Sequence, residues 1–205
     1  SLFPHRVLGK LIYYTAERKA RALNPKEGLK FLFELDRNLY PLEGALAVLL
    51  DNGLHTKHRH TKYHDFFVEH INPGEKVLDI GCGNGALTYD VAEKVENVEV
   101  LGIDLSSGNI AVACEKYGRQ NINYIVGDVL EDGTLTINHF DVVILSNVLE
   151  HLPGRSIFLS KVWAKVNPKR MLIRVPLFER DWRVPLKKEL GVEWRLDSTH
   201  ETEYT

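Results

Sequence analysis

The sequence contains little cysteine and no long apolar segment. Its 205 residues include only two cysteines, Cys82 and Cys114. Two cysteines are too few for the disulfide framework of a small secreted domain, so we expect a reducing, cytoplasmic environment. The longest apolar runs, such as residues 45–50 and 142–145, fall far short of the roughly 20 residues that cross a bilayer. The sequence therefore predicts no membrane span.

Neither sign of charge predominates in the composition. The 26 Lys and Arg residues and 28 Asp and Glu residues leave a formal net charge of -2, which gives no general attraction to nucleic acids or anionic membranes. A nucleic-acid partner is therefore not expected. We also expect no secretory signal, because Pro4, His5 and Arg6 interrupt the start of the chain. With 44% apolar and 26% charged residues, the chain has the composition of a globular protein with one substantial core.

Residues 1–70 are predicted to form a helical cap. Apolar residues recur at helical spacing in 7–12, and again in 42–50. We interpret Pro41 as the first residue of that second helix, because proline is favoured at the first helical position. A third helix is expected over about residues 57–71.

Residues 71–175 have a different rhythm, in which short apolar runs alternate with helical segments. Nearly continuous apolar strands separated by helices predict a mostly parallel sheet that is covered on both faces. The expected fold class is therefore a doubly wound, Rossmann-like α/β domain with an N-terminal helical extension. Strands are expected near 77–80, 98–103, 124–126, 140–146 and 171–175, and helices near 86–95, 107–117 and 156–166. The third stretch, residues 176–205, is charged and has no regular period.

A glycine-rich loop follows the first expected strand. Gly81, Gly83 and Gly85 occupy alternate positions, and glycine lets the backbone approach a ligand closely because it has no Cβ and can adopt positive φ. In a doubly wound sheet, such a loop lies at the carboxyl end of a strand, where ligands bind. Gly81, Gly83 and Ala86 also satisfy the dinucleotide fingerprint G-x-G-x-x-G/A, so a nicotinamide-dependent oxidoreductase is one alternative.

The residues around this loop resemble a different family. Asp79 precedes the first glycine by two residues, and Asp79–Gly85 has the form D-x-G-x-G-x-G. This segment, with the ordered motifs of residues 60–175, resembles the class I S-adenosylmethionine-dependent methyltransferases of the small-molecule branch. The resemblance implies transfer of a methyl group from S-adenosylmethionine to a small-molecule acceptor, leaving S-adenosylhomocysteine. A further alternative is a binding module that keeps this fold but has lost turnover.

The resemblance also implies a cofactor site built from loops that follow strands and from the helix before the first strand. Its expected members are Asp79, Gly81, Cys82, Gly83, Gly85, Asp104, Leu105, Asp128, Val129, Ser146, Asn147, Tyr63 and Arg59. Asp104 would accept hydrogen bonds from ribose hydroxyls, Asp128 would accept from the adenine amino group, and Arg59 would pair with the cofactor carboxylate. The alternatives are a helix cap for Asp104, a turn carboxylate for Asp128 and a solvated basic face for Arg59.

Two histidines are the candidate catalytic residues. The resemblance places His200 near the methyl acceptor, and His151 follows the fourth strand. If the acceptor is a hydroxyl, either imidazole could remove its proton; the alternative is a surface histidine. His60 and His64 have the i, i+4 spacing of metal ligands, but no further ligand pattern accompanies them, and no metal site is predicted.

The sequence departs from the family pattern after residue 175. The family's sheet has seven strands, whereas residues 176–205 are interpreted as an acceptor-side insertion in which Trp182 and Trp194 could line the acceptor pocket. We therefore expect the C-terminal strands to be truncated. The fifth strand would then be an open edge, which formation of a homodimer could cover.

Overall fold

The computed structural model describes residues 4–50, 56, 60–135, 139–178, 181, 183–195, 197–202 and 204. Arg59 and Trp182, which the sequence analysis assigns to the site, lie outside these residues. The chain divides into two compact units. Residues 178–198 group with the N-terminal helices in one unit, and residues 199–204 group with 56–177 in the other. Within the described ranges, no helix is both long enough and apolar enough to cross a membrane.

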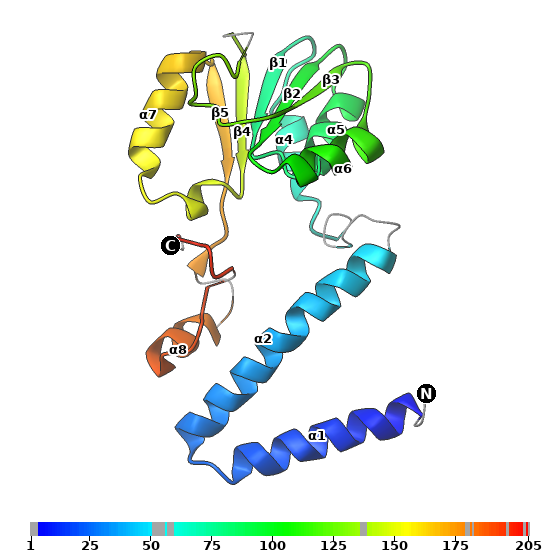
Figure 1. Ribbon diagram of the computed structural model, residues 1–205, viewed down its shortest axis with the longest axis vertical. Coiled ribbons are helices and arrows are strands. Elements are labelled where there is room, and N and C mark those ends of the chain that lie inside the picture. The colour runs from blue at the N-terminus through cyan, green and yellow to red at the C-terminus, as the bar shows by residue number, and fades with distance from the viewer. Residues whose placement is uncertain are drawn as a thin grey trace. The chain divides into compact units, whose positions relative to one another are not determined.

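The larger unit is built around a parallel five-stranded sheet (Figure 1), which confirms the predicted Rossmann-like α/β fold. Its strands are β1 (Lys76–Ile80), β2 (Glu99–Asp104), β3 (Ile122–Val126), β4 (Val142–Ser146) and β5 (Arg170–Arg174). The strand order is β3-β2-β1-β4-β5. The chain therefore runs outward from β1 to β3 and then returns to the other side of β1. In open α/β sheets, ligands bind at the carboxyl ends of the strands at this reversal.

Helices connect and cover these strands. They are α4 (Tyr63–Glu69), α5 (Ala86–Lys94), α6 (Ser107–Tyr117), the 3-10 helix η1 (Leu149–His151) and α7 (Arg155–Val166). The Ser106 side chain caps α6 by accepting from the Asn109 backbone N–H at 3.2 Å. Asn167 ends α7 in the left-handed conformation, with φ 49°. A helix is expected over residues 57–71, and α4 (Tyr63–Glu69) is shorter than that prediction.

Alternating side chains of the strands form two cores, one on each face of the sheet. On β4, Val142 and Ile144 pack with the α4–α5 side, whereas Val143 and Leu145 pack with the α7 side. These four side chains are fully buried. Because successive strand residues point to opposite faces, a sheet covered on both faces requires the continuous apolar runs seen in the sequence.

The smaller unit contains α1 (His5–Arg21), α2 (Pro25–Leu50) and α8 (Arg183–Leu190). The prediction that Pro41 begins a helix is wrong, because Pro41 lies inside α2. A proline within a helix removes one backbone hydrogen bond, yet the apolar pattern continues on both sides of it. The sequence analysis also missed α8, in which half of the eight residues RVPLKKEL are charged. Pro185 is compatible with α8 because it stands in the first turn, where backbone N–H groups have no partner within a helix.

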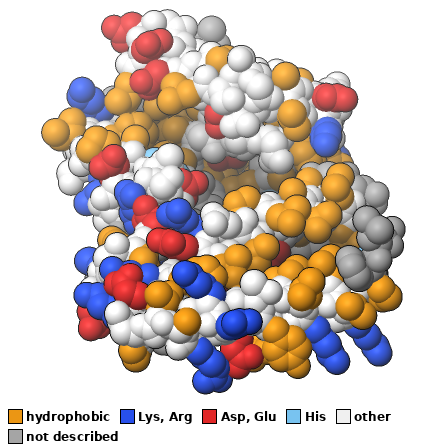
Figure 2. All heavy atoms as spheres, turned by 60° about the horizontal axis from the view of Figure 1, so that its bottom comes forward, with side chains coloured by type: hydrophobic (Ala, Val, Ile, Leu, Met, Phe, Trp, Pro, Cys, Tyr) orange, Lys and Arg blue, Asp and Glu red, His pale blue; other side chains and the backbone are white. Residues whose placement is uncertain are grey.

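Both N-terminal helices expose apolar side chains. Leu8 and Leu11 on α1 and Leu42 and Leu46 on α2 are each more than two-fifths exposed, and Figure 2 shows apolar side chains between charged ones on the face that carries these helices. No described residue of α1 is buried. The helical spacing of apolar residues thus predicts a helix over 7–12 and over 42–50, although α2 begins much earlier, at Pro25. It does not mark a buried core within this unit.

Candidate functional site

The glycine-rich loop connects the end of β1 to α5, with all three glycines at positive φ. The φ values are 72° at Gly81, 55° at Gly83 and 84° at Gly85. A Cβ atom at Gly81 would lie 2.7 Å from the Val148 side chain, and one at Gly85 would lie 2.6 Å from the Tyr124 hydroxyl. At Gly83, in contrast, no described atom lies within 4 Å of that position. The loop is therefore packed tightly at its two ends and open at its middle.

Asp104, at the end of β2, holds this loop in place. Its Oδ2 accepts from the Gly83 backbone N–H at 2.9 Å, and its Oδ1 accepts from the Ser106 N–H at 2.8 Å and the Asn109 side chain at 3.2 Å. These bonds use three of the roughly four acceptor positions of a carboxylate. Asp104 can therefore accept from a ligand hydroxyl while it still orders the loop. It does not cap α6, since Ser106 has that role.

Asp79 lies beneath the loop and is only 1% exposed. The Thr88 hydroxyl donates to its Oδ2 at 2.7 Å. Burial raises the pKa of Asp79 to about 6, against the opposing effect of the Thr88 hydrogen bond. A buried carboxylate with one neutral partner is costly to ionise, so Asp79 links β1 to α5 at some expense of stability.

Cys82 is 8% exposed, and its nearest polar partner is the Gly83 carbonyl oxygen at 3.8 Å. Burial raises the pKa of its thiol far above the ordinary value. Because the thiolate is the nucleophilic form of cysteine, Cys82 is not an activated nucleophile. Its place in the loop suits packing and backbone contact with a ligand.

The ends of β2 and β3 lie together beside the loop. The Gly127 backbone N–H donates to the Asp104 carbonyl oxygen at 3.0 Å, which brings Asp128 close to Asp104. Asp128 Oδ1 accepts from the Leu130 N–H at 2.8 Å, the local turn bond that the sequence analysis left as an alternative role. Leu105 is 75% exposed, whereas Val129 belongs to the core. The exposed Leu105 side chain and the carboxylates of Asp104 and Asp128 thus follow the carboxyl ends of β2 and β3.

On the other side of the loop, Asn147 follows β4 with φ 58°. Its Oδ1 accepts from Arg174, at the end of β5, at 2.6 Å. The Arg174 guanidinium also lies 4.2 Å from the ring centroid of Tyr63, and burial raises the pKa of Tyr63 to about 12. The sequence analysis placed Tyr63, Ser146 and Asn147 here but missed Arg174. The available signal was a charged residue at the carboxyl end of an apolar strand.

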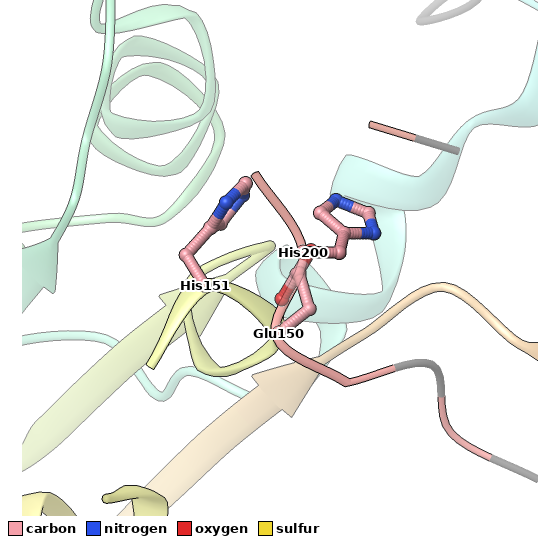
Figure 3. Close-up of side chains that lie close together, drawn as sticks. All are labelled: Glu150, His151 and His200. Atoms are coloured by element: carbon pink, nitrogen blue, oxygen red, sulfur yellow. The ribbon is translucent and has the colours of Figure 1, made fainter. Parts of the chain in front are cut away.

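His151 and His200 lie side by side, although 48 residues separate them in the chain. Their ring centroids are 4.7 Å apart and their planes make an angle of 81°. Glu150 stands beside them, and Figure 3 shows all three side chains together. Glu150 has no exposed surface, and His200 is 4% exposed. The sequence analysis did not identify Glu150, because a glutamate after a strand is usually a cap or a surface residue.

Two other suggestions from the sequence have different outcomes. His64 forms a 2.7 Å contact with Asp90 through its Nδ1, so this atom is already engaged within the α4–α5 pair. Trp194 belongs to the smaller unit. There it packs with the Phe178 ring at 5.4 Å between centroids and beneath the Lys188 ammonium at 4.8 Å. These contacts give Trp194 a packing role in that unit.

Comparisons with known proteins find similarity to methyltransferases over part of this chain. Residues 77–169 match a family model described as a methyltransferase domain. N-methyltransferase 4 of Papaver somniferum is 32% identical over 100 residues, which cover 46% of this chain and 28% of the relative. The mitochondrial ubiquinone biosynthesis O-methyltransferase of Saccharomyces cerevisiae is 33% identical over 114 residues, covering 53% of this chain and 35% of the relative.

The crystal structure of the small RNA methyltransferase HEN1 has a similar fold. It superposes with a TM-score of 0.57 at 22% identity, over 71% of this chain and 20% of that chain. At this identity, the likeness concerns the fold alone. The chain thus spans about a third or less of the length of the two curated relatives.

Proposed function

We propose that this chain, whose residues 77–169 match a methyltransferase-domain model, is a class I S-adenosylmethionine-dependent methyltransferase that transfers a methyl group from S-adenosylmethionine to a small-molecule acceptor. The observation that carries the proposal is the open position at Gly83, next to the Asp104 carboxylate and the exposed Leu105. The relatives named above are methyltransferases, which favours this function over the nicotinamide-dependent alternative. Their N- and O-methyltransferase names support a small-molecule acceptor.

The residues around the loop fit such a cofactor. The open position at Gly83 leaves room for a ligand against the backbone, Asp104 retains acceptor capacity for ribose hydroxyls, and Leu105 offers apolar surface to an adenine ring. The bound cofactor would supply a methyl group on a positively charged sulfur. The acceptor attacks the methyl carbon in line, and the sulfur leaves as the thioether of S-adenosylhomocysteine. The work of the chain is then to align the acceptor with that methyl group and to exclude water.

We assign the cofactor contacts by their position around the loop. The Gly81–Gly85 backbone, including Cys82, would surround the methionine part, with Asp79 supporting it from below. The adenosine side would be held by Asp104, Leu105, Asp128 and Val129, and the methionine side by Ser146, Asn147 and Tyr63. Arg59 remains a prediction for the cofactor carboxylate.

Replacement of Asp104 by alanine is expected to weaken cofactor binding by about 1–3 kcal/mol, because ribose hydroxyls would lose a charged acceptor. Calorimetric titration with S-adenosylhomocysteine measures this change. The matched control is Asp132→Ala, which removes a fully exposed carboxylate and should leave the affinity unchanged. Because Asp104 also orders the loop, thermal unfolding of both variants should accompany the titration. Unchanged affinity in a folded Asp104→Ala protein would show that Asp104 does not hold the ribose.

We place the methyl acceptor near His151 and His200. His200→Ala is expected to slow methyl transfer by about 10²–10⁴-fold, the range for loss of a group that handles the acceptor proton. Its affinity for S-adenosylhomocysteine should remain within about twofold, because the imidazole is assigned to the acceptor. The assay is a screen of small-molecule acceptors with labelled cofactor, and the control is the exposed His139→Ala. Equal rates for His200→Ala and wild type would remove His200 from the reaction.

Two features bear on assembly and compartment. In the described part of the chain, β5 pairs with β4 on one side only, and an open edge can be covered by a second copy. We therefore predict a homodimer, which sedimentation velocity would detect; a monomer at micromolar concentration would contradict it.

Cys82 and Cys114 are both free thiols, which supports our proposal of a reducing, cytoplasmic environment.

A further inference from the structure

Three potential metal ligands converge where β4 ends. Glu150 and His151 belong to η1, and His200 comes from the segment that returns to it (Figure 3). One donor atom from each side chain lies within 4.8 Å of the other two. Ligands of one tetrahedral Zn²⁺ ion, at about 2.0–2.2 Å from the metal, lie about 3.3–3.6 Å apart. Side-chain rotations that shorten the longest of these separations by up to about 1.5 Å would therefore bring the three atoms onto one ion.

The Glu150 carboxylate is the observation that requires a partner. Its side chain is fully buried, and neither oxygen has a hydrogen-bond partner among the described residues. A buried carboxylate without a partner is costly, because burial penalises the charged form. Burial accordingly raises the pKa of Glu150, while the nearby His151, His200 and Arg174 act in the opposite direction. A cation between the carboxylate and the imidazoles would supply the missing partner.

The backbone holds the returning segment against η1. The Glu150 carbonyl oxygen accepts from the Glu201 N–H at 2.6 Å and from the Thr202 N–H at 3.2 Å. Arg155 donates to the Thr202 hydroxyl. These bonds fix His200 opposite Glu150 through main-chain geometry, so the three side chains are brought together by the fold itself. Such support is what a metal site needs from the residues around it.

His151 is oriented by a further contact. Its Nδ1 lies 2.9 Å from the Thr199 hydroxyl, which leaves Nε2 as the ring atom that would bind a metal ion. Metal-binding histidines in proteins almost always engage their second ring nitrogen in this way. Thr199 is therefore a positioning residue for His151.

We propose that Glu150, His151 and His200 bind one divalent transition-metal ion, with Zn²⁺ as the best fit. Two imidazoles and one carboxylate form a ligand set typical of zinc sites that keep an open position. This assignment goes beyond the sequence analysis, which predicts no metal site. If the proposed function holds, on which this step rests, the metal site implies an acceptor that carries a hydroxyl group. That hydroxyl would occupy the open coordination position of the metal ion. A divalent cation lowers the pKa of a bound hydroxyl, so His200 would assist the loss of the acceptor proton as a metal ligand, and solvent would accept that proton.

Metal titration of the whole chain, freed of metal by a chelator, tests the site without any assay of activity. Co²⁺ is the probe, because its visible absorption reports imidazole and carboxylate coordination, and Zn²⁺ is the competitor. Wild type should bind one Co²⁺ ion that Zn²⁺ displaces. Glu150→Gln, which keeps the shape of the side chain, and His200→Ala should each bind at least about 100-fold more weakly. Thr199→Val should lose about 10–100-fold in affinity, the usual effect of removing a supporting partner.

His139→Ala is the matched control, because His139 is exposed and lies outside the cluster; it should bind Co²⁺ as wild type does. Titration with S-adenosylhomocysteine on the same samples separates this inference from the proposed function. If wild type binds S-adenosylhomocysteine but neither Co²⁺ nor Zn²⁺, the metal site is refuted and the proposed function stands. Equal Co²⁺ affinity in wild type and Glu150→Gln would likewise refute the site.

Discussion

Gly85→Ala is expected to lower the free energy of unfolding by about 2–5 kcal/mol. Gly85 has φ 84°, and a left-handed conformation costs a residue with a Cβ roughly 1–2 kcal/mol. The new Cβ would lie 2.6 Å from the Tyr124 hydroxyl and 2.9 Å from the Ala113 Cβ, and overpacking of this kind costs about 1–3 kcal/mol more. Tyr124 cannot move away freely, because its hydroxyl lies 3.3 Å from both the Gly85 and the Tyr117 carbonyl oxygens and donates to one or the other.

Gly83→Ala is the matched comparison within the same loop. Gly83 also has positive φ, but its Cβ would meet no described atom within 4 Å. Only the conformational cost of roughly 1–2 kcal/mol applies, while the added methyl group fills the space assigned to the cofactor. Urea unfolding of both variants measures the difference. Equal stability of Gly83→Ala and Gly85→Ala would contradict the packing described for the loop.

Asp79→Asn is expected to stabilise the protein at pH 8 by about 3 kcal/mol and to leave its stability nearly unchanged at pH 4. The folded pKa of about 6 lies above the ordinary value of 3.8 for an aspartate, so the folded state binds more protons between these values and stability falls as pH rises through them. The size follows from about 1.4 kcal/mol for each pH unit between the two values. Asparagine keeps an oxygen that can accept from Thr88 but carries no buried charge.

Asp141→Asn provides a control of opposite sign. The Lys76 backbone N–H donates to Asp141 at 2.9 Å, and Lys169 lies 2.9 Å away; these contacts hold the pKa of Asp141 below its ordinary value. Its stabilising effect is present at neutral pH and is lost as pH falls through that lowered pKa, so Asp141→Asn should destabilise the protein at pH 7. Urea unfolding across pH 4–8 measures both variants. A pH-independent effect of Asp79→Asn would contradict the buried charge at that position.

The sheet could be predicted from the sequence because its physical requirement is simple. Strands buried on both faces need apolar residues at successive positions, and Val142–Leu145 satisfies this without interruption. The same reasoning fails for α8, which has no apolar period, and for Pro41, where a continuing helix accepts the loss of one hydrogen bond. Local pattern therefore predicts elements that have an apolar period and misses those that lack one.

The candidate site could be predicted only where function depends on local backbone. Gly81 and Gly83 are recognisable because the positive φ values of this loop favour glycine. The grouping of Glu150 with His200 depends on a segment that returns to η1 after 49 further residues, and no local pattern carries that information. Arg174 was missed for a similar reason, because its partners Asn147 and Tyr63 come from other elements.

The most direct test of the central claim is a calorimetric titration of the whole chain with S-adenosylhomocysteine and, separately, with NADH. We predict that wild type binds S-adenosylhomocysteine, that Gly83→Ala loses most of this affinity while remaining folded, and that NADH gives no saturable heat. Binding of NADH without S-adenosylhomocysteine, or equal S-adenosylhomocysteine affinity in wild type and Gly83→Ala, would contradict the assignment of this loop to an adenosyl cofactor.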